Sequence, residues 1–372
     1  MRYYSTNKQS PLATLEEAVI KGLACDKGLF MPEMIPVIDK KVIAGMKNNS
    51  FQENAHIEAL AFFGEDMDSQ ALTDIVYDTL SYETPVVHVH DNLFSFVLYP
   101  KGQVSQIQEC QFTTLGQNIT ALEINGTFDD CQALVKAAFV DDELNRRMLL
   151  TSANSINVAR FLPQAFYYFD AYAQLDRIGK ADELVVCVPS GNLGNLTAGL
   201  FAYKMGLPVK HFIAANNRND ILCEYLNTGA YNPRPSVETY ANAMDVGNPS
   251  NFARIRDLFD NSHELISRLI SGYRYTNEQI VETIREVYRK YDYLLDPHGA
   301  CGYQALVDIG LHPDETGLFL ETAHPAKFKE TVDMILNADI AIPSKLQAFM
   351  KGEKKNVPLS KDFKDFKNFL LF

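Results

Sequence analysis

The sequence lacks closely spaced cysteines, and that absence removes two kinds of site. Its six cysteines stand singly, without a C-x-x-C pair, so neither a zinc ribbon nor a dithiol redox motif is supported. It also lacks an apolar run long enough to span a membrane, and its first residues, MRYYSTNKQSPL, are too polar for a secretory signal. We therefore expect a cytoplasmic protein whose thiols are reduced.

Basic residues are in the minority, which argues against two kinds of partner. The 372 residues include 34 Lys and Arg against 47 Asp and Glu, a formal net charge of -13. Nucleic acids and anionic membranes both attract clusters of Lys and Arg, so we expect neither as a partner. With 47% hydrophobic residues, the chain is long enough for two or three domains around sizeable cores.

The order of the elements predicts an α/β protein. Residues 1–80 have mainly helical patterns, whereas strand and helix patterns alternate further along the chain. The clearest unit is a buried strand over 184–188, a helix over 195–205 and a strand over 209–215. Strand, helix and strand at this spacing are typical of a βαβ unit in a parallel sheet.

Other segments extend this pattern. An earlier βαβ unit is expected where the strand VVHVH, a helix over 105–115 and the strand NITALEI follow one another. Residues 216–260 are predicted to form a long irregular excursion, and Thr276 with Gln279 forms a capping box before the next helix. The predicted regions are an N-terminal helical region (1–80), a smaller α/β domain (81–183), a larger α/β domain (184–345) and a C-terminal helical tail (346–372).

A glycine turn, SGNLGN at residues 190–195, follows the buried strand and opens the helix. A helix N-terminus at the carboxyl end of a parallel strand offers unpaired N–H groups and partial positive charge, so it favours an anion. Gly191 and Gly194 let the backbone approach closely, and a phosphate monoester suits the turn best. The turn matches neither G-x-x-x-x-G-K-[ST] nor G-x-G-x-x-G, which disfavours nucleotides. A tight turn with glycines for steric reasons alone is the alternative.

The turn resembles the phosphate-binding loop of pyridoxal-phosphate enzymes of the tryptophan synthase β type. Longer segments resemble the threonine synthases of that family, among them YYSTNKQSPLATLEEAVIKGLACDKGLFMPE, NSINVARFLPQ, MDVGNPSNF, DPHGACGYQAL and ETAHPAKF. They occur in the family's order over most of the chain. The resemblance implies a tryptophan synthase β-like fold, with an N-terminal mainly helical region and two α/β domains around pyridoxal 5'-phosphate.

The resemblance also implies roles for nine residues. Five of them would bind the cofactor phosphate: Gly191, Asn192, Leu193, Gly194 and Asn195. The hydroxyl of Thr322 would meet the pyridine nitrogen and leave it largely unprotonated, whereas the residues alone favour a helix cap at this position. Ser155, Asn157 and Arg160 match the substrate-side segment of the family. Arg160 would fork onto a phosphate or carboxylate, with a structural salt bridge as the alternative.

One part of the family pattern has no match in this chain. Family members carry a segment resembling HGPTLAFKD, whose lysine binds the cofactor covalently, and a later segment resembling ATSGDTG. Here LFSF runs directly into VLYPKGQ, so no catalytic lysine is assigned. Either a block of about 60 residues, two βαβ units, is absent between Phe96 and Val97, or the chain truly lacks it. We favour the first explanation because the rest of the chain keeps the family pattern.

The junction also has a purely local explanation. VVHVH-DN-LFSFVLYP can form a hairpin with Asp91 and Asn92 at its turn. His88 and His90 would then share one face, but two histidines without a third ligand do not indicate a metal site.

A short segment near the C-terminus imitates part of the lysine motif. Phe363, Lys364 and Asp365 have the right order, but the phenylalanines of KDFKDFKNFLLF recur every third residue. That spacing is typical of one apolar helix face. We therefore expect Lys364 to be solvated and the terminal helix to dock on the protein's own surface.

The function that the resemblance implies is the conversion of O-phospho-L-homoserine and water to L-threonine and phosphate by a β,γ-replacement. The nearest alternative is a related pyridoxal-phosphate lyase or dehydratase for a hydroxy or phospho amino acid. A chain that truly lacks the lysine would instead be a non-catalytic protein that binds a phosphorylated metabolite. The sequence assigns no metal site and no oligomeric state.

Overall fold

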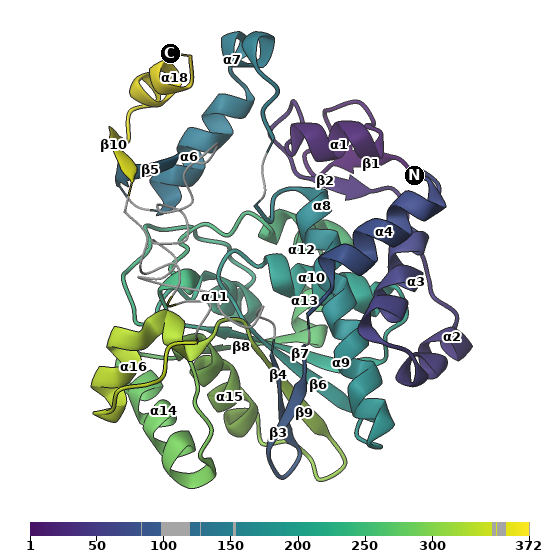
Figure 1. Cartoon of the computed structure of the whole chain (residues 1–372), viewed down its shortest axis with the longest axis vertical. Helices are drawn as coiled ribbons and strands as arrows, with labels where there is room; N and C mark the ends of the chain where they lie inside the picture. The colour runs from purple at the N-terminus through teal and green to yellow at the C-terminus, as the bar shows by residue number, and fades with distance from the viewer. Residues whose placement is uncertain are drawn as a thin grey trace.

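A six-stranded sheet with helices against both faces forms the centre of the molecule (Figure 1). The computed structural model describes residues 1–82, 84–97, 120–126, 128–151, 154–343, 347 and 355–371. In the order in which they lie side by side, the strands are β3 (Val86–His90), β4 (Leu93–Val97), β9 (Thr316–Glu321), β6 (Leu184–Pro189), β7 (Val209–Asn216) and β8 (Ile270–Arg274). All neighbours pair in parallel except β3 with β4. The expected α/β fold is confirmed.

Helices cover the two faces of this sheet as separate layers. One face is covered by α9 (Ala165–Arg177), α10 (Gly194–Lys204), α11 (Ile221–Thr228), α12 (Phe252–Leu258) and α13 (His263–Leu269). The other face is covered by α14 (Asn277–Tyr291), α15 (Pro297–Ile309) and α16 (Lys329–Leu336). Short 3-10 turns connect some elements: η1 (Met46–Asn48), η2 (Leu162–Gln164), η3 (Asn242–Met244) and η4 (Pro325–Phe328).

The sequence of β6, LVVCVP, shows why this strand lies in the middle of the sheet. All six of its residues are buried. Leu184, Val186 and Val188 pack into the core on the α10 side, whereas Val185 and Cys187 pack into the core on the α15 side. A strand buried on both faces needs apolar side chains at every position, as parallel sheets between helix layers do.

The N-terminal region packs against the α10 side of the sheet. It consists of β1 (Tyr3–Ser5), β2 (Phe30–Pro32), α1 (Leu15–Lys21), α2 (Lys40–Gly45), α3 (Phe51–Phe63) and α4 (Ser69–Thr79). Thr14 and Glu17 form a capping box at the start of α1, which is the sequence signature of a helix start. The mainly helical character predicted for residues 1–80 agrees with these elements.

The junction that lacks the lysine motif forms a hairpin of β3 and β4. Asp91 occupies its turn with φ 46°, as the local explanation predicted. The His90 ring nitrogen Nε2 forms a hydrogen bond with the Tyr303 hydroxyl at 2.7 Å. The His90 ring also stacks on Tyr291, with 4.2 Å between the ring centroids. Within the described part of the chain, no three His, Cys, Asp or Glu side chains are grouped so that they could hold a metal ion.

The C-terminal tail docks on the chain's own surface, as the amphipathic pattern predicted. β10 (Asn356–Ser360) pairs in parallel with β5 (Ala121–Asn125), and α18 (Phe363–Leu371) contacts α6 (Phe128–Phe139) and α7 (Asp142–Arg147). This two-stranded layer stands apart from the main sheet (Figure 1). Lys367 forms an ion pair with Asp141 at 2.8 Å, whereas Lys364 is exposed.

Several expectations need correction. The strands of the earlier βαβ unit are β3 and β5, which belong to different sheets, so the unit does not form one sheet; its helix over 105–115 lies outside the described residues. The irregular excursion expected over 216–260 contains α11 and α12. Before β6 the chain forms α8 (Val158–Phe161), η2 and α9 rather than one continuous helix, because Pro163 cannot donate a backbone hydrogen bond. The domain boundaries stay a prediction, and β3 and β4 join the sheet of the larger predicted domain.

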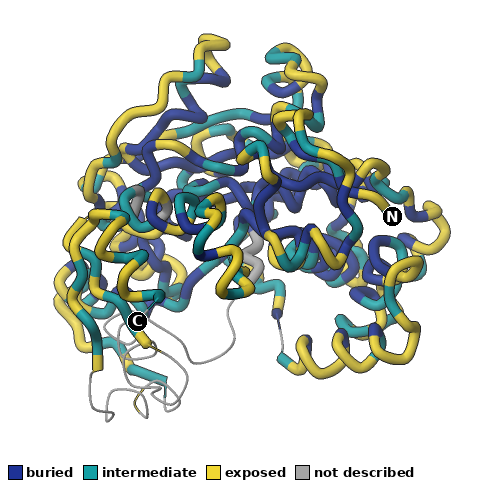
Figure 2. The backbone as a smooth tube through the Cα atoms, turned by 90° about the horizontal axis from the view of Figure 1, so that it is seen from above, coloured by how far each residue is buried: buried dark blue, intermediate teal, exposed yellow. Residues whose placement is uncertain are grey.

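The burial pattern identifies one dense centre. Buried residues concentrate around the sheet and the helices next to it, and exposed residues lie on the outer helices and loops (Figure 2). None of the described helices combines the length and the apolar character that crossing a bilayer requires.

Replacing Leu318 by alanine should destabilise the protein strongly, because Leu318 is fully buried in β9 between two paired strands. We expect a loss of about 2–5 kcal/mol in the free energy of unfolding, from lost apolar contact and the remaining cavity. The control is Ile75→Ala on α4, where the side chain is half exposed and the loss should stay within about 0.5 kcal/mol. Urea unfolding followed by circular dichroism measures both, and equal losses would contradict the placement of this core.

Candidate functional site

The turn between β6 and α10 leaves backbone N–H groups available at the carboxyl edge of the sheet. Leu193, at the N-cap of α10, has a left-handed conformation with φ 60°, and within the described chain no side chain caps the helix. Ser190 fixes the start of the turn, because its N–H donates to the Ala215 carbonyl at 2.8 Å and its hydroxyl to the Val188 carbonyl at 2.9 Å. The free N–H groups and the helix dipole favour an anion at this point.

Both glycines of the turn are required by close neighbours. A Cβ on Gly191 would lie 2.9 Å from the Ala243 carbonyl oxygen, and a Cβ on Gly194 would lie 2.7 Å from the Ser155 Cβ. Real Cβ atoms do not approach that closely, so a side chain at either position would displace its neighbour. Steric crowding, the alternative explanation of the turn, therefore explains why residues 191 and 194 are glycines. It does not conflict with an anion site, because the N-terminus of α10 is left uncapped within the described chain.

A network of small polar side chains supports the turn from behind. The Asn192 amide donates to the Ser155 hydroxyl at 3.2 Å and accepts from the Ser250 N–H at 2.6 Å. The Asn251 amide donates to the same Ser155 hydroxyl at 3.1 Å and to the Asn192 carbonyl at 2.9 Å. Ser155, predicted on the substrate side, therefore contacts the phosphate turn and links two candidate groups.

Asn195 is oriented by a buried tyrosine. The Tyr168 hydroxyl lies 2.8 Å from both the backbone oxygen and the side-chain oxygen of Asn195, so it shares its proton between them. The amide nitrogen of Asn195 is left to donate to another group. Tyr168 was not singled out from the sequence, since an aromatic residue in a helix is most often part of the core.

Thr322 follows β9, the strand beside β6, and so emerges at the same edge of the sheet as the turn. The helix-cap interpretation of Thr322 is wrong, because His324 caps η4 through its ring nitrogen. No described residue forms a hydrogen bond with the Thr322 hydroxyl. Because adjacent parallel strands end side by side, an α/β sheet forms its ligand crevice at such an edge.

An open cleft of about 700 Å³ brings together four of the nine predicted site residues. Asn157, Arg160, Asn195 and Thr322 all line it, although they come from three distant parts of the sequence. Gly191, Asn192, Leu193 and Gly194 lie in the adjoining turn rather than in the lining. Convergence of the predicted residues on one cleft is the main structural support for the site.

Two of these residues differ in how they are held. Asn157 caps α8 by accepting from the Ala159 N–H at 3.0 Å and donates to the Val19 carbonyl at 2.8 Å, so it is fixed by the fold. Arg160 is exposed, and its guanidinium forms no salt bridge with any described carboxylate. The salt-bridge alternative for Arg160 is therefore not found in the described chain, and its charge faces the cleft.

A buried acid–histidine cluster lies behind the turn and was missed in the sequence. Asp296 accepts from the His298 ring at 2.6 Å, and the other ring nitrogen accepts from the Ala243 N–H at 3.2 Å, beside Gly191. Burial and the neighbouring Asp296 raise the pKa of Glu321 well above its usual range, which favours its protonated form. The Asp-Pro-His segment gives only a helix-start signal in sequence.

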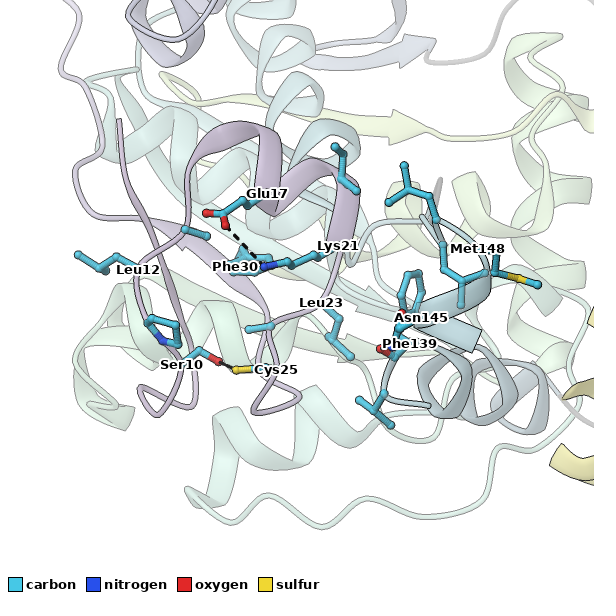
Figure 3. Close-up of a pocket in the computed structure, with 17 residues that line it drawn as sticks. Ser10, Leu12, Glu17, Lys21, Leu23, Cys25, Phe30, Phe139, Asn145 and Met148 are labelled. Carbon is cyan, nitrogen blue, oxygen red and sulfur yellow. Dashed lines mark hydrogen bonds and ion pairs between the residues drawn. The ribbon is translucent and has the colours of Figure 1, made fainter. Parts of the chain in front are cut away.

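The more enclosed cavity shown in Figure 3 lies elsewhere and has a different character. It occupies about 390 Å³ between the N-terminal region and residues 139–150, from the end of α6 to just beyond α7. Most of its walls are apolar, and its lysine, Lys21, forms an ion pair with Glu17 at 3.7 Å. This lining offers no group of free donors for a phosphate, so the cleft at the sheet edge remains the candidate site.

Three family models match successive parts of the chain. The model described as threonine synthase N terminus matches residues 2–80, the pyridoxal-phosphate dependent enzyme model matches residues 94–321, and the threonine synthase C-terminal model matches residues 299–370. The second of these contains the anion turn, the substrate-side segment and β9, and its last matched residue directly precedes Thr322.

Characterised proteins resemble the chain over its full length. A threonine synthase from Haemophilus influenzae is 38% identical and the match covers 100% of both chains. The crystal structure of the threonine synthase from Escherichia coli is 34% identical, with a TM-score of 0.92 over 100% of this chain and 99% of that one. A threonine synthase from Brucella melitensis with bound pyridoxal phosphate is 28% identical, with a TM-score of 0.87.

The length of the Haemophilus match bears on the junction at Phe96. That match extends over 427 positions, whereas the chain has 372 residues. At least 55 of those positions therefore have no residue in this chain. This difference is close to the size of the block that the sequence lacks.

Pyridoxal phosphate fits the residues that the structure brings together. The uncapped helix N-terminus and the glycine positions suit its phosphate, and the Thr322 hydroxyl, without a described partner, suits the pyridine nitrogen. The cofactor has these two polar ends on one flat ring, and the turn and Thr322 follow neighbouring strands.

Replacing Gly194 by alanine should weaken binding of pyridoxal phosphate by about tenfold or more, since the new Cβ would push Ser155 or the turn out of place. The control is Gly45→Ala at the end of α2, where a Cβ meets nothing within 4 Å. Equilibrium dialysis gives both affinities. A Gly194→Ala protein that binds as tightly as the control protein would contradict the placement of the phosphate.

Proposed function

Because the chain belongs to the threonine synthases, a family of pyridoxal-phosphate-dependent lyases, we propose that it converts O-phospho-L-homoserine and water to L-threonine and phosphate. The single observation that supports this substrate is that Arg160, Asn195 and Thr322 all line the same cleft. The exposed Arg160 and the anion-binding turn lie at one sheet edge, which suits a reaction in which both the cofactor and the substrate carry a phosphate.

The cofactor phosphate would bind to the turn from Gly191 to Asn195, through backbone N–H groups and the Asn192 and Asn195 amides. The ring nitrogen would face the Thr322 hydroxyl. When bound, pyridoxal phosphate supplies an electron sink for charge that develops at the α-carbon of an amino acid. Tyr168, which fixes the Asn195 oxygen, keeps the amide nitrogen of Asn195 pointed away from itself and available to the ligand.

The substrate would lie between the turn and Arg160. Its planar carboxylate and its tetrahedral phosphate each present two oxygens that a guanidinium can contact with two N–H groups. Ser155 accepts two hydrogen bonds from Asn192 and Asn251 and donates its hydroxyl proton to the Asn154 side-chain oxygen at 3.4 Å, so its hydroxyl is held in place beside the turn. Asn157 holds the start of α8, and with it Arg160, at the wall of the cleft.

A segment inserted between Phe96 and Val97 would lie at this same edge. Phe96 lies opposite Leu320 and Val97 opposite Glu321 in the parallel register of β4 with β9, so the junction is one to two residues before the level of Thr322. A chain that continues from Phe96 would therefore emerge beside the proposed ring site. We propose that the native protein carries an additional segment here and that its lysine reaches the cofactor from this strand end.

A non-catalytic binding protein is the second candidate, and the absence of the lysine motif from the 372 residues is the observation that favours it. A related lyase or dehydratase is the third, and the full-length match to threonine synthases counts against it. The binding protein would bind pyridoxal phosphate without covalent attachment, whereas a lyase would release phosphate without forming threonine.

We expect the purified protein, supplied with pyridoxal phosphate, to form one L-threonine for each phosphate released from O-phospho-L-homoserine. Amino-acid analysis and a phosphate assay measure the two products. The intact mass, determined on the same sample, should exceed 41.9 kDa by several kilodaltons. A mass of 41.9 kDa together with absent turnover would favour the binding protein, and phosphate without threonine would favour the other lyase.

Replacing Arg160 by methionine should raise the KM for O-phospho-L-homoserine by about tenfold or more, because it removes the charged guanidinium group and keeps an unbranched side chain. The affinity for pyridoxal phosphate should stay unchanged, because Arg160 lies outside the phosphate turn. The matched control is Arg146→Met on α7, which is exposed and is not part of the cleft lining. An unchanged KM in the Arg160 protein would contradict its place in the substrate site.

A further inference from the structure

Arg254 is a fully buried cation directly behind the phosphate turn. It lies on α12, and its side chain has no exposure to solvent. Its guanidinium stacks on the Phe161 ring at 3.9 Å. Its N–H groups donate to the carbonyls of Phe30, Ser155 and Ile156, at 2.7 to 3.2 Å, and to the Asn251 amide oxygen at 2.7 Å.

The charge of Arg254 has no anionic partner within the described part of the chain. All its acceptors are neutral oxygens, and it forms no ion pair with a described Asp or Glu. Burial lowers the pKa of Arg254 to about 9, so the group is still charged at neutral pH. A buried charge without a counter-charge is destabilising in an isolated protein, so its presence requires an explanation beyond hydrogen bonding.

One residue separates this guanidinium from the anion site. Asn251 accepts from Arg254 and donates to the Asn192 carbonyl and the Ser155 hydroxyl. Its amide nitrogen would lie 3.5 Å from a Cβ on Gly194, the first residue of α10. Arg254 therefore approaches the start of α10 from the protein interior, on the side opposite the solvent.

We propose that Arg254 is a positioning residue whose buried charge balances the phosphate of the cofactor while its hydrogen bonds hold Ser155 and Asn251 against the turn. The inference rests on the proposed use of pyridoxal phosphate. Because the charge lies in a medium of low polarity, its attraction for the phosphate is stronger than that of a solvated lysine at the same distance. The counter-charge that the fold lacks is then supplied by the ligand.

A purely structural role makes a different prediction. If Arg254 only joins Phe30, Ser155 and Asn251, its loss should weaken every ligand of the cleft alike. If its charge acts on the phosphate, its loss should weaken pyridoxal phosphate and spare pyridoxal, which lacks the phosphate. The ratio of the two affinities isolates the charge from the general effect of a loosened fold.

The experiment compares Arg254→Met with Arg254→Lys, since both variants lose the guanidinium fork and only one loses the charge. Equilibrium dialysis gives the dissociation constants of pyridoxal phosphate and pyridoxal for each protein. We expect the preference for pyridoxal phosphate to fall about tenfold or more in the Met variant and less than about threefold in the Lys variant. Equal losses in the two variants, or parallel losses for both ligands, would overturn the proposal.

Phe161→Leu is the control for stability, because it removes the ring beneath the guanidinium and keeps the charge. It should reduce thermal stability without changing the preference between the two ligands. A wild-type protein that fails to bind pyridoxal phosphate would overturn the proposed function, and the inference with it. A wild-type protein that binds it, with no selective effect in the Met variant, would overturn the inference alone.

A measurement on the wild-type protein covers the case in which the Met variant does not fold. Salt screens exposed cations at the surface much more than it screens a buried charge. We expect the preference for pyridoxal phosphate to fall less than about threefold when sodium chloride is raised about tenfold. A fall in proportion to the salt concentration would assign the attraction to surface charges and overturn the proposal.

Discussion

The free backbone N–H groups at the start of α10 are the constraint on which the rest of the structure depends. They exist because β6 is buried on both faces and ends at a sharp turn, with Leu193 in a left-handed conformation. The turn is tight enough to require glycine at two positions, and that closeness brings Ser155 and Asn251 against it. The sheet, the polar network and Arg254 all hold the turn in position, so that an anion can bind at one fixed place.

The local parts of this arrangement could be predicted from the sequence. The strand over 184–188 and the helix over 195–205 lie within one residue of β6 and α10, because a short apolar run and two glycines determine both ends. The capping box at Thr276 is formed as predicted. The family resemblance added Thr322 and Arg160, which no local pattern links to the turn, and the structure brings both to the same cleft.

The remainder depends on contacts between distant residues, which periodicity does not encode. Arg254, His298 and Tyr168 each look like ordinary helix residues in sequence, and their importance follows from neighbours that only the fold supplies. Ile75 on α4 is apolar and yet half exposed, since that helix has a single covered side. The two strands expected in the earlier βαβ unit, β3 and β5, joined different sheets, because pairing in a sheet is decided by the whole chain.

The parallel pairing of β10 with β5 has a consequence for the order of folding. Asn356 pairs with Ala121, so this layer joins residues more than 200 positions apart. During synthesis from the N-terminus, every strand of the main sheet has left the ribosome before β10 does. The sheet edge with its anion turn can therefore assemble first, while the layer of β5 and α6 waits for the last residues of the chain. Such distant pairing is slow to form, which makes the C-terminus the final step in completing the molecule.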